Sequence, residues 1–207
     1  MKIEIFSDVV CPWCYLGQAR FRQAVAAFPG EVEIVWRPFQ LDPSTPVPSP
    51  GPADVWLEEK FGGSEQVANA HSRLRALTGA EDLPYEPEKA LRVNSFDAHR
   101  VSWYAGEQGV QDAVVARLFR AHHAEGRDVS DPATLAKIGE EAGLPGVAEL
   151  LASDRGRAEV GEQIGRAQSL GISGVPFFLF EGKWGVSGAQ PTEVFTSALE
   201  EVAENLA

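Results

Sequence analysis

The two cysteines are the residues whose type and spacing point most directly to chemistry. Cys11 and Cys14 are the only cysteines among 207 residues, and two residues separate them. One turn of chain can hold both sulfurs close enough for a disulfide. We expect Cys11 to lie at the start of a helix, where free backbone N–H groups and the helix dipole favour the thiolate, the form that attacks disulfides. The pair therefore predicts a reactive dithiol.

Two other uses of such a pair fit the sequence less well. A structural zinc site commonly needs four ligands, but no second cysteine pair exists, and His122 and His123 are adjacent rather than spaced. We therefore expect no metal. A purely structural disulfide would close a very short loop and would constrain the unfolded chain little. Redox chemistry is the interpretation that remains strongest.

The residues around the cysteines predict a strand, a helix and a second strand. Residues 2–6 form a buried strand pattern, and Pro12 falls in the first helical turn, where its missing N–H costs nothing. Pro29 and Gly30 end the helix. Residues 31–39 are rich in β-branched and aromatic side chains and predict the second strand. This βαβ unit implies a parallel pair with a right-handed crossover, and it puts the cysteines at the first strand-to-helix turn.

The middle of the chain predicts helices. Residues 43–52 hold five prolines, so we expect a loop without regular structure there. From residue 53 to 170 no good strand pattern occurs. Helical patterns broken by glycine and proline cover 64–77, 94–108, 113–123, 133–142, 147–152 and 154–170. Asp131 followed by Pro132 predicts an N-cap and a first helical residue.

The last 37 residues change character again, from residue 171 to 207. An apolar strand pattern ends at Phe180, a tight turn at Glu181 and Gly182 predicts a hairpin with residues 183–187, and Pro191 opens a final helix. The predicted order is α/β: βαβ, an all-helical insertion, then ββα. We expect a first domain part at 1–42, the insertion at 43–170 and a second domain part at 171–207.

Composition excludes some partners. The formal net charge is −12 and the pI is about 4.8, which argues against nucleic acid and against anionic membrane surfaces. No apolar run approaches the roughly 20 residues of a membrane span. A strand pattern follows Met1 at once, without the longer apolar core of a signal peptide. We therefore expect a cytoplasmic protein, where two lone cysteines are more often catalytic than structural.

Four segments carry a resemblance to a known family. They read SDVVCPWCYLG at 7–17, WRPFQLDP at 36–43, NSFDAHR at 94–100 and GISGVPFF at 171–178. With the predicted element order, the chain resembles the DsbA-like thiol:disulfide oxidoreductases, and within them the FrnE-like subgroup. The resemblance implies a thioredoxin fold interrupted by a helical insertion. It also implies a disulfide- or dithiol-containing protein or small molecule as substrate.

The same resemblance implies roles for individual residues. Pro176 corresponds to the family's cis-proline, which packs against the cysteine pair, and the backbone of Val175 would bind an extended substrate segment. Many relatives carry a buried acid six residues before the first cysteine, where this chain has Ile5. Asp8 is the nearest substitute for that proton carrier, or else a loop residue that caps the helix.

A second resemblance supplies the alternative. Kappa-class glutathione transferases and 2-hydroxychromene-2-carboxylate isomerases share this architecture, but they usually have serine at the position of Cys11 and lack the second cysteine. This alternative is a glutathione-dependent isomerase or transferase for an aromatic or polyketide-like small molecule, with glutathione as co-substrate. Asn94 and Ser95 fall in a motif that tends to face the active site in this wider group. Asn94 is equally well explained as a helix N-cap.

The remaining candidates have both a structural and a functional explanation. His99 belongs to the NSFDAHR motif and is either structural or part of the site. Trp13 lies between the cysteines and would shield the disulfide or contact substrate. Phe39 is one of several aromatic residues that would line a groove, although core packing is the default. We expect surface or insertion positions for His71, His122 and His123. A monomer and a homodimer are both compatible with the sequence.

Overall fold

Four strands form the sheet that positions the cysteines. In the computed structural model, which describes residues 1–206, the strand order is β2-β1-β5-β6. The last residue of the predicted 171–207 part lies outside the described residues. β1 pairs parallel with β2 and antiparallel with β5, so Ile5 faces Trp36 on one side and Phe178 on the other. The parallel pair and the antiparallel hairpin are those expected from the sequence.

The segments before and after the insertion form this sheet and two helices that pack on it. They are β1 (Lys2–Ser7), α1 (Pro12–Ala27), β2 (Glu33–Pro38), β5 (Phe177–Phe180), β6 (Trp184–Ser187) and α9 (Thr192–Leu206). Pro12 occupies the first helical turn of α1, as predicted. Phe21 of α1 and Phe195 of α9 pack against Phe178, with ring centres 5.0 and 4.6 Å from it. Together they fix α1 and α9 on one face of the sheet.

The insertion contains the other helices and two very short strands. They are β3 (Gly51–Pro52), α2 (Ala53–Phe61), α3 (Ser64–Ala80), β4 (Leu91–Arg92), α4 (Phe96–Glu107), α5 (Gln111–His123), α6 (Pro132–Glu141), α7 (Val147–Leu151) and α8 (Arg157–Ser169), with a 3₁₀ turn at Pro87–Lys89. The Asp131 side chain accepts the Thr134 N–H at 2.8 Å, which confirms the predicted N-cap of α6.

Two expectations for the insertion were wrong. Residues 43–52 were expected to lack regular structure and 53–170 to lack strands, yet Gly51 and Pro52 pair antiparallel with Leu91 and Arg92. A two-residue strand has no periodicity that a sequence pattern could carry, and Pro52 tolerates this place on an edge strand. Helix α2 was not predicted either, because none of its residues is buried and it has no apolar face to detect.

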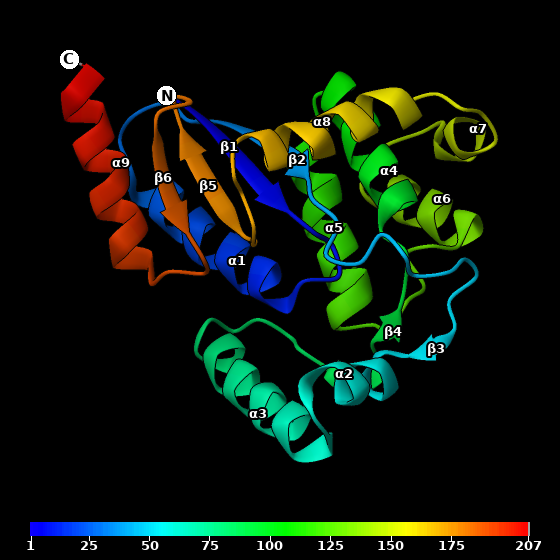
Figure 1. Cartoon of the computed structure of the whole chain (residues 1–207). Coiled ribbons are helices and arrows are strands. Elements are labelled where there is room, and N and C mark those ends of the chain that lie inside the picture. The colour runs from blue at the N-terminus through cyan, green and yellow to red at the C-terminus, as the bar shows by residue number, and fades with distance from the viewer. Residues whose placement is uncertain (207) are drawn as a thin grey trace.

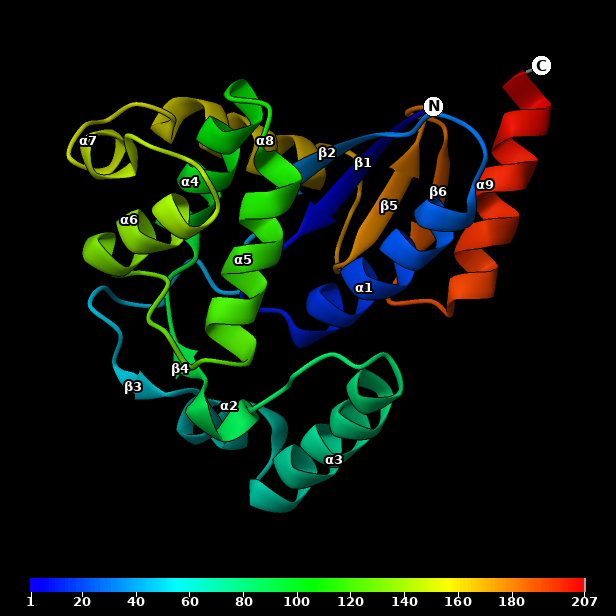
Figure 2. The ribbon, with the colours of Figure 1, turned by 180° about the vertical axis from the view of Figure 1, so that it is seen from behind.

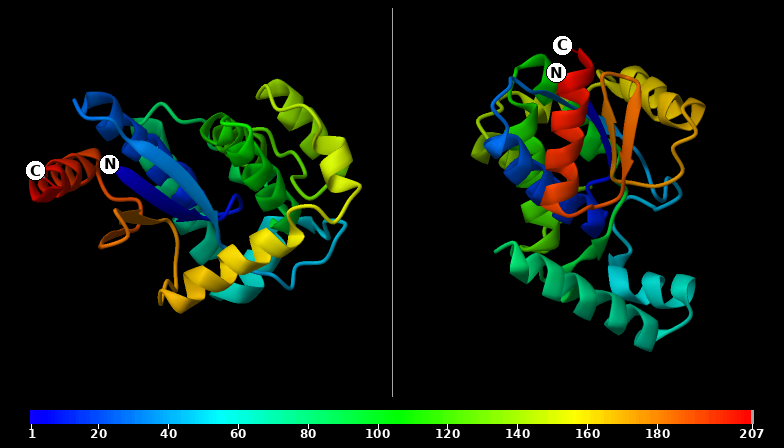
Figure 3. Two further views of the ribbon diagram at one scale, coloured as in Figure 1. Left: turned by 90° about the horizontal axis from the view of Figure 1, so that it is seen from above. Right: turned by 90° about the vertical axis from the view of Figure 1, so that its left-hand side faces the viewer.

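The helices form layers around the sheet. Figures 1 and 2 show α1 and α5 on one face and α8 on the other. Phe6 and Leu179 of the sheet pack with Ala167 of α8, so this helix covers a sheet face although it lies in the predicted insertion. Viewed from above in Figure 3, the sheet lies between α1 and α8. The α2–α3 hairpin lies apart from these layers, beneath the N-terminal end of α1 (Figure 1). Among the described residues, no helix has the length and apolar character needed to span a membrane.

Candidate active site

The cysteines lie at the N-terminal end of α1, as their spacing predicts. Cys11 is the N-cap residue, with φ −88° and ψ 112°, and its carbonyl accepts the N–H of Cys14 at 3.0 Å and of Tyr15 at 3.2 Å. Both cysteines are free thiols, and they are 4% and 1% exposed. Cys11 therefore stands at the positive end of the helix dipole, while Cys14 lies one turn inside the protein.

The two sulfurs have different surroundings. Burial and the neighbouring Cys11 sulfur raise the pKa of the Cys14 thiol well above its ordinary value. The backbone N–H of Asp8 and the Ser7 hydroxyl lie beside the same sulfur and act in the opposite direction, but they do not outweigh burial. Cys14 is consequently a protonated thiol at neutral pH.

A proline loop faces Cys11 from the other half of the chain. The peptide bond between Val175 and Pro176 is cis, and the Cys11 thiol donates to the Val175 carbonyl oxygen at 3.7 Å. The Gly188 N–H holds the Pro176 carbonyl at 2.8 Å, which fixes the loop against the start of the β6–α9 connection. Residues 11 and 175 thus meet across 164 positions of sequence.

Gly17 is a residue whose role the sequence did not reveal. A Cβ atom at this position of α1 would lie 3.0 Å from Pro176 Cγ and 3.4 Å from Ala189 Cα. Glycine therefore allows the close approach of the proline loop to the helix that carries the cysteines. The glycine in the SDVVCPWCYLG segment is the only sequence signal of this contact.

Asp8 is buried beneath the cysteine loop. It is 0% exposed, its Oδ2 accepts the Leu41 N–H at 2.8 Å, and its Oδ1 accepts the Val10 N–H at 3.4 Å. The His99 Nε2 lies 3.4 Å from the same Oδ1 and donates to the Phe39 carbonyl at 2.9 Å. The structure therefore brings Asp8, His99 and the Phe39 backbone together. The Asp8 side chain does not cap α1.

The other predicted site residues have contacts of their own. The Phe39 ring packs with Phe6 and Ala167 in a core cluster. Asn94 accepts the Phe96 N–H at 3.0 Å and donates to the Thr45 carbonyl at 2.8 Å, so it orders the start of α4 and the proline-rich segment 43–52. It also lines an open groove of about 300 Å³. Trp13 packs against the core and lies under the guanidinium group of Arg73, 5.6 Å from the ring centre.

His122 and His123 lie in the insertion, one of the two placements expected from the sequence, and both are buried there at 2% exposure. Their helix turns them inward, four residues after the buried apolar side chains of Leu118 and Phe119, and this helical spacing indicates their burial. His123 Nε2 donates to the Val9 carbonyl at 2.9 Å. Burial lowers the pKa of His122 to about 4, and burial together with the neighbouring His122 lowers the pKa of His123 well below its ordinary value. Both rings are neutral at pH 7.

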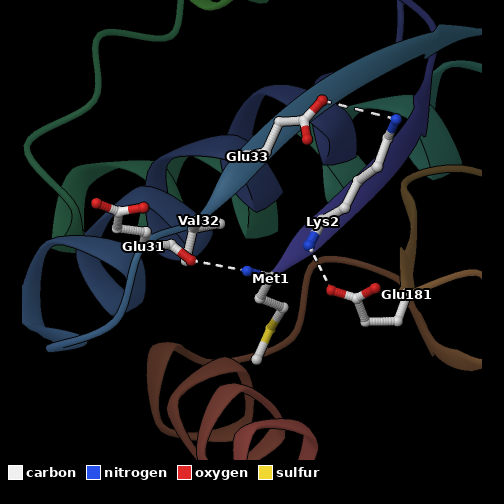
Figure 4. Close-up of a pocket in the computed structure, with 6 residues that line it drawn as sticks. All are labelled: Met1, Lys2, Glu31, Val32, Glu33 and Glu181. Atoms are coloured by element: carbon white, nitrogen blue, oxygen red, sulfur yellow. Dashed lines mark hydrogen bonds and ion pairs between the residues drawn. The ribbon is translucent and has the colours of Figure 1, made fainter. Parts of the chain in front are cut away.

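A second hollow lies at the opposite end of the sheet. Its volume is about 660 Å³. Figure 4 shows the residues that line it: Met1, Lys2, Glu31, Val32, Glu33 and Glu181. The Lys2 N–H donates to Glu181 at 2.7 Å. Because this hollow surrounds the start of β1 and the cysteines follow its end, it is separate from the dithiol. Among residues 1–206, no three histidine, cysteine or carboxylate side chains are grouped as a metal site would require.

Known structures with the same fold include disulfide oxidoreductases and an isomerase. A probable DsbA oxidoreductase from Streptomyces coelicolor is 40% identical, with a TM-score of 0.91 over 97% of this chain and 89% of that one. The cytosolic disulfide reductase DsbM from Pseudomonas aeruginosa, solved with GSH, is 22% identical, with a TM-score of 0.71 over 99% and 100%. A 2-hydroxychromene-2-carboxylate isomerase is 19% identical, with a TM-score of 0.75 over 99% and 97%.

At 22% and 19% identity, the similarity to DsbM and to the isomerase shows a shared fold alone. The family comparison goes further, because the DSBA-like thioredoxin domain matches residues 2–200. That match spans the cysteine pair, the whole insertion and the cis-proline loop. This chain therefore belongs to the DSBA-like thioredoxin domain family.

Proposed function

We propose that this protein is a thiol:disulfide oxidoreductase in which Cys11 and Cys14 form the redox couple. The observation that carries the proposal is the unequal setting of the two sulfurs. Cys11 lies at the helix N-terminus, while burial and the Cys11 sulfur raise the pKa of Cys14. A dithiol exchanges disulfides in two steps when one sulfur attacks first and the other stays protonated until it is needed. Membership of the DSBA-like family supports the same chemistry.

The reaction follows from these positions. The Cys11 thiolate attacks one sulfur of a substrate disulfide, a mixed disulfide forms, and the second substrate sulfur leaves with the electron pair. Cys14 then loses its proton and attacks Cys11, which releases the remaining substrate sulfur and leaves the enzyme as a disulfide. The same steps in reverse oxidise a substrate dithiol. Substrates would be disulfide- or dithiol-containing proteins or small molecules.

The cis-proline loop is the proposed substrate-binding segment. The Val175 carbonyl already accepts from the Cys11 thiol at 3.7 Å, so a chain bonded to Cys11 would pass directly beside this backbone. Pro176 has no N–H and lies against Gly17, and its ring forms a wall next to the cysteine helix. Trp13 would offer apolar contact to the same segment.

Asp8 is the proposed acceptor of the Cys14 proton. Ile5, at the position of the family's buried acid, is fully buried and apolar. Glu4, its neighbour, is bound by Arg37 at 2.6 Å and by Arg166 at 2.7 Å. The Asp8 N–H lies beside the Cys14 sulfur, and within residues 1–206 Asp8 Oδ1 has two polar partners, the Val10 N–H and His99 Nε2, both at 3.4 Å. A buried carboxylate oxygen with weak partners is suited to accept a proton.

A glutathione-dependent isomerase or transferase is the second candidate. The isomerase of the same fold supports it, and the DsbM structure with GSH supports glutathione as a co-substrate for either candidate. The two candidate functions differ in whether they need Cys14. An isomerase or transferase would use Cys11 alone, in contact with the glutathione sulfur. Since DsbM is described as cytosolic, we extend the proposal to a cytoplasmic protein that acts among reduced thiols.

The test uses single cysteine variants and a disulfide substrate. The reduced protein is mixed with glutathione disulfide or a disulfide-bonded peptide, and adducts are counted by mass spectrometry. Cys11→Ser is expected to abolish exchange, and Cys14→Ser is expected to accumulate a mixed disulfide on Cys11. Full activity of Cys11→Ser would overturn the proposal. Full catalytic activity of Cys14→Ser with glutathione would favour the second candidate.

A further inference from the structure

Arg73 of α3 differs from the other arginines in its surroundings. The other twelve each pair with a carboxylate within residues 1–206. Arg73 is exposed, and its side chain has neither an ion pair nor a hydrogen bond with these residues. Its guanidinium group lies over the ring of Trp13, 5.6 Å from the ring centre. In a chain of net charge −12, one positive charge is thus left without a partner next to the residue that follows Pro12 and precedes Cys14.

The position of α3 does not depend on this charge. Glu81, at the C-terminal end of α3, accepts from Arg20 of α1 at 2.7 Å, and these side chains are only 15% and 12% exposed. The contact between Arg73 and Trp13 lies about two helical turns earlier on each helix. The two helices therefore run side by side in the same direction, as Figures 1 and 2 show. Because a largely buried ion pair already ties α3 to α1, the exposed guanidinium group is available for another role.

Trp13 places the guanidinium group beside the dithiol. It lies in the first turn of α1, between Cys11 and Cys14, and its ring packs against the core cluster that contains both cysteines. A cation within about 6 Å of a ring centre is attracted to the ring, which holds Arg73 at this place. The contact leaves N–H donors of the guanidinium group for a further partner, and in the described part of the chain they have no acceptor.

The partner that this group recognises best is a carboxylate. The planar guanidinium group of arginine can donate two parallel hydrogen bonds to the two oxygens of a carboxylate. Cys11 and Trp13 lie within one helical turn, which is about 5.4 Å of helix, while an extended chain advances about 3.3 Å per residue. A carboxylate within about three residues of a sulfur bonded to Cys11 spans that length. The acidity of the rest of the protein repels such a substrate, so a local positive charge matters for it.

We propose that Arg73 is a specificity residue that binds a carboxylate of the substrate next to the disulfide that Cys11 attacks. The proposal rests on the function proposed above and names the class of its substrate: disulfides that carry a carboxylate close to the reacting sulfur. A small thiol with carboxylates of its own and a short acidic peptide both supply this group. Arg73 donates to the carboxylate while Trp13 holds the guanidinium group from the other side. The exchange of sulfurs is unchanged.

The test compares pairs of disulfides that differ only in one charge. The first pair is glutathione disulfide and the same compound with its glycine carboxylates converted to amides. The second is a short peptide disulfide with either glutamate or glutamine beside its cysteine. Formation of the mixed disulfide is timed in a Cys14→Ser background by acid quenching and mass spectrometry. Arg73→Gln is expected to lower the ratio of the charged to the neutral rate by about threefold or more, and added salt should reduce the difference.

Two further variants separate charge, geometry and general effects. Arg73→Lys keeps the charge but loses the paired donors, and its ratio should lie between those of the parent and Arg73→Gln. Lys183→Gln is the matched control, because Lys183 also lies 5.6 Å from the centre of a tryptophan ring, that of Trp184. It changes the net charge equally, but at the opposite end of the sheet, where the Glu181 N–H donates to the Lys2 carbonyl. Its ratio should equal that of the parent.

The outcomes distinguish this proposal from the proposed function. A response of one pair of disulfides alone identifies the small thiol or the peptide as the source of the carboxylate. If Arg73→Gln slows both members of each pair equally, Arg73 only supports Trp13, and the proposal is overturned. Unchanged ratios overturn it as well, while exchange by the same protein leaves the proposed function standing. A parent protein that forms no adduct with any of the four disulfides would overturn both. Circular dichroism confirms that each variant is folded.

Discussion

His123 donates its Nε2–H to the carbonyl oxygen of Val9 at 2.9 Å, across 114 positions of sequence. Val9 lies in the loop that delivers Cys11, and His123 lies at the end of α5 in the insertion. The His123 ring also stacks on Tyr15 of α1, with ring centres 5.2 Å apart. The insertion therefore anchors the loop that carries Cys11, in addition to covering the faces of the sheet with α5 and α8.

This contact predicts the effect of His123→Phe. Phenylalanine keeps the stacking on Tyr15 but removes the donor, and the buried Val9 carbonyl loses its partner. The free energy of unfolding should fall by about 1–3 kcal/mol, the usual cost of a buried polar group left without a hydrogen bond. Urea unfolding of the reduced protein measures it. An unchanged midpoint and slope would mean that the Val9 carbonyl finds another partner.

The buried histidines predict a loss of stability in acid. Burial lowers the pKa of His122 from its ordinary 6.5 to about 4 in the folded protein. Between these two pH values, His122 therefore binds a proton in the unfolded chain but not in the folded protein. Stability is fully present above about pH 6.5 and is lost as the pH falls toward about 4, by up to about 3 kcal/mol for this residue.

The His122→Asn variant separates this effect from the titration of carboxylates. Its free energy of unfolding, measured with urea at several pH values across that window, should fall less steeply than that of the parent. Parallel curves for the two proteins would contradict the assignment.

The close approach of Pro176 to α1 predicts that Gly17→Ala will be harmful. The added Cβ would lie 3.0 Å from Pro176 Cγ, so the proline loop must move away from the cysteine helix. We expect disulfide exchange to slow by roughly tenfold, because misplacing reacting groups by a fraction of an ångström is costly. Gly165→Ala is the control, since a Cβ there meets nothing within 4 Å. It should stabilise α8 by about 1 kcal/mol and leave the exchange rate unchanged.

The proposed role of Asp8 predicts a selective defect in the second step. Asp8→Asn keeps the shape and the hydrogen bond from Leu41 but removes the proton acceptor. The mixed disulfide should still form on Cys11, while its resolution by Cys14 slows by about tenfold or more. Rapid quenching with acid and mass analysis of the adduct follow both steps. Equal slowing of both steps would instead indicate a structural role for Asp8.

The sequence predicted well what local chemistry determines. Pro12 at the first helical turn, the cysteine spacing and the apolar pattern of 2–6 each act within a few residues, and the sheet and α1 form where they indicate. Asp131 likewise caps α6 as expected. The resemblance added the thioredoxin fold and the role of Pro176. The predicted division at residues 42 and 170 stays a prediction.

What the sequence did not reveal depends on residues that meet only in the folded chain. His123 and Val9 are 114 positions apart. His71 links Asp54 and Tyr85 through a contact at each ring nitrogen. The sequence near Gly17 does not explain the glycine, because the contact with Pro176 exists only in the folded chain. Arg100, within the NSFDAHR motif, is fully buried and donates to the Leu150 and Arg155 carbonyls, at 2.9 Å each, and the motif alone does not indicate this role. Substrate contacts of Asn94 and His99 stay predictions.

The most direct test of the account is the redox equilibrium of the cysteine pair. The protein is equilibrated in glutathione buffers of different ratio, and the Cys11–Cys14 disulfide is quantified by acid quenching, thiol labelling and mass spectrometry, with tryptophan fluorescence as a second signal. The account predicts one reversible two-electron transition, at a midpoint somewhere between about −270 and −120 mV, that Cys14→Ser abolishes. A protein that forms no intramolecular disulfide at any ratio, while Cys11 alone binds glutathione, would contradict it.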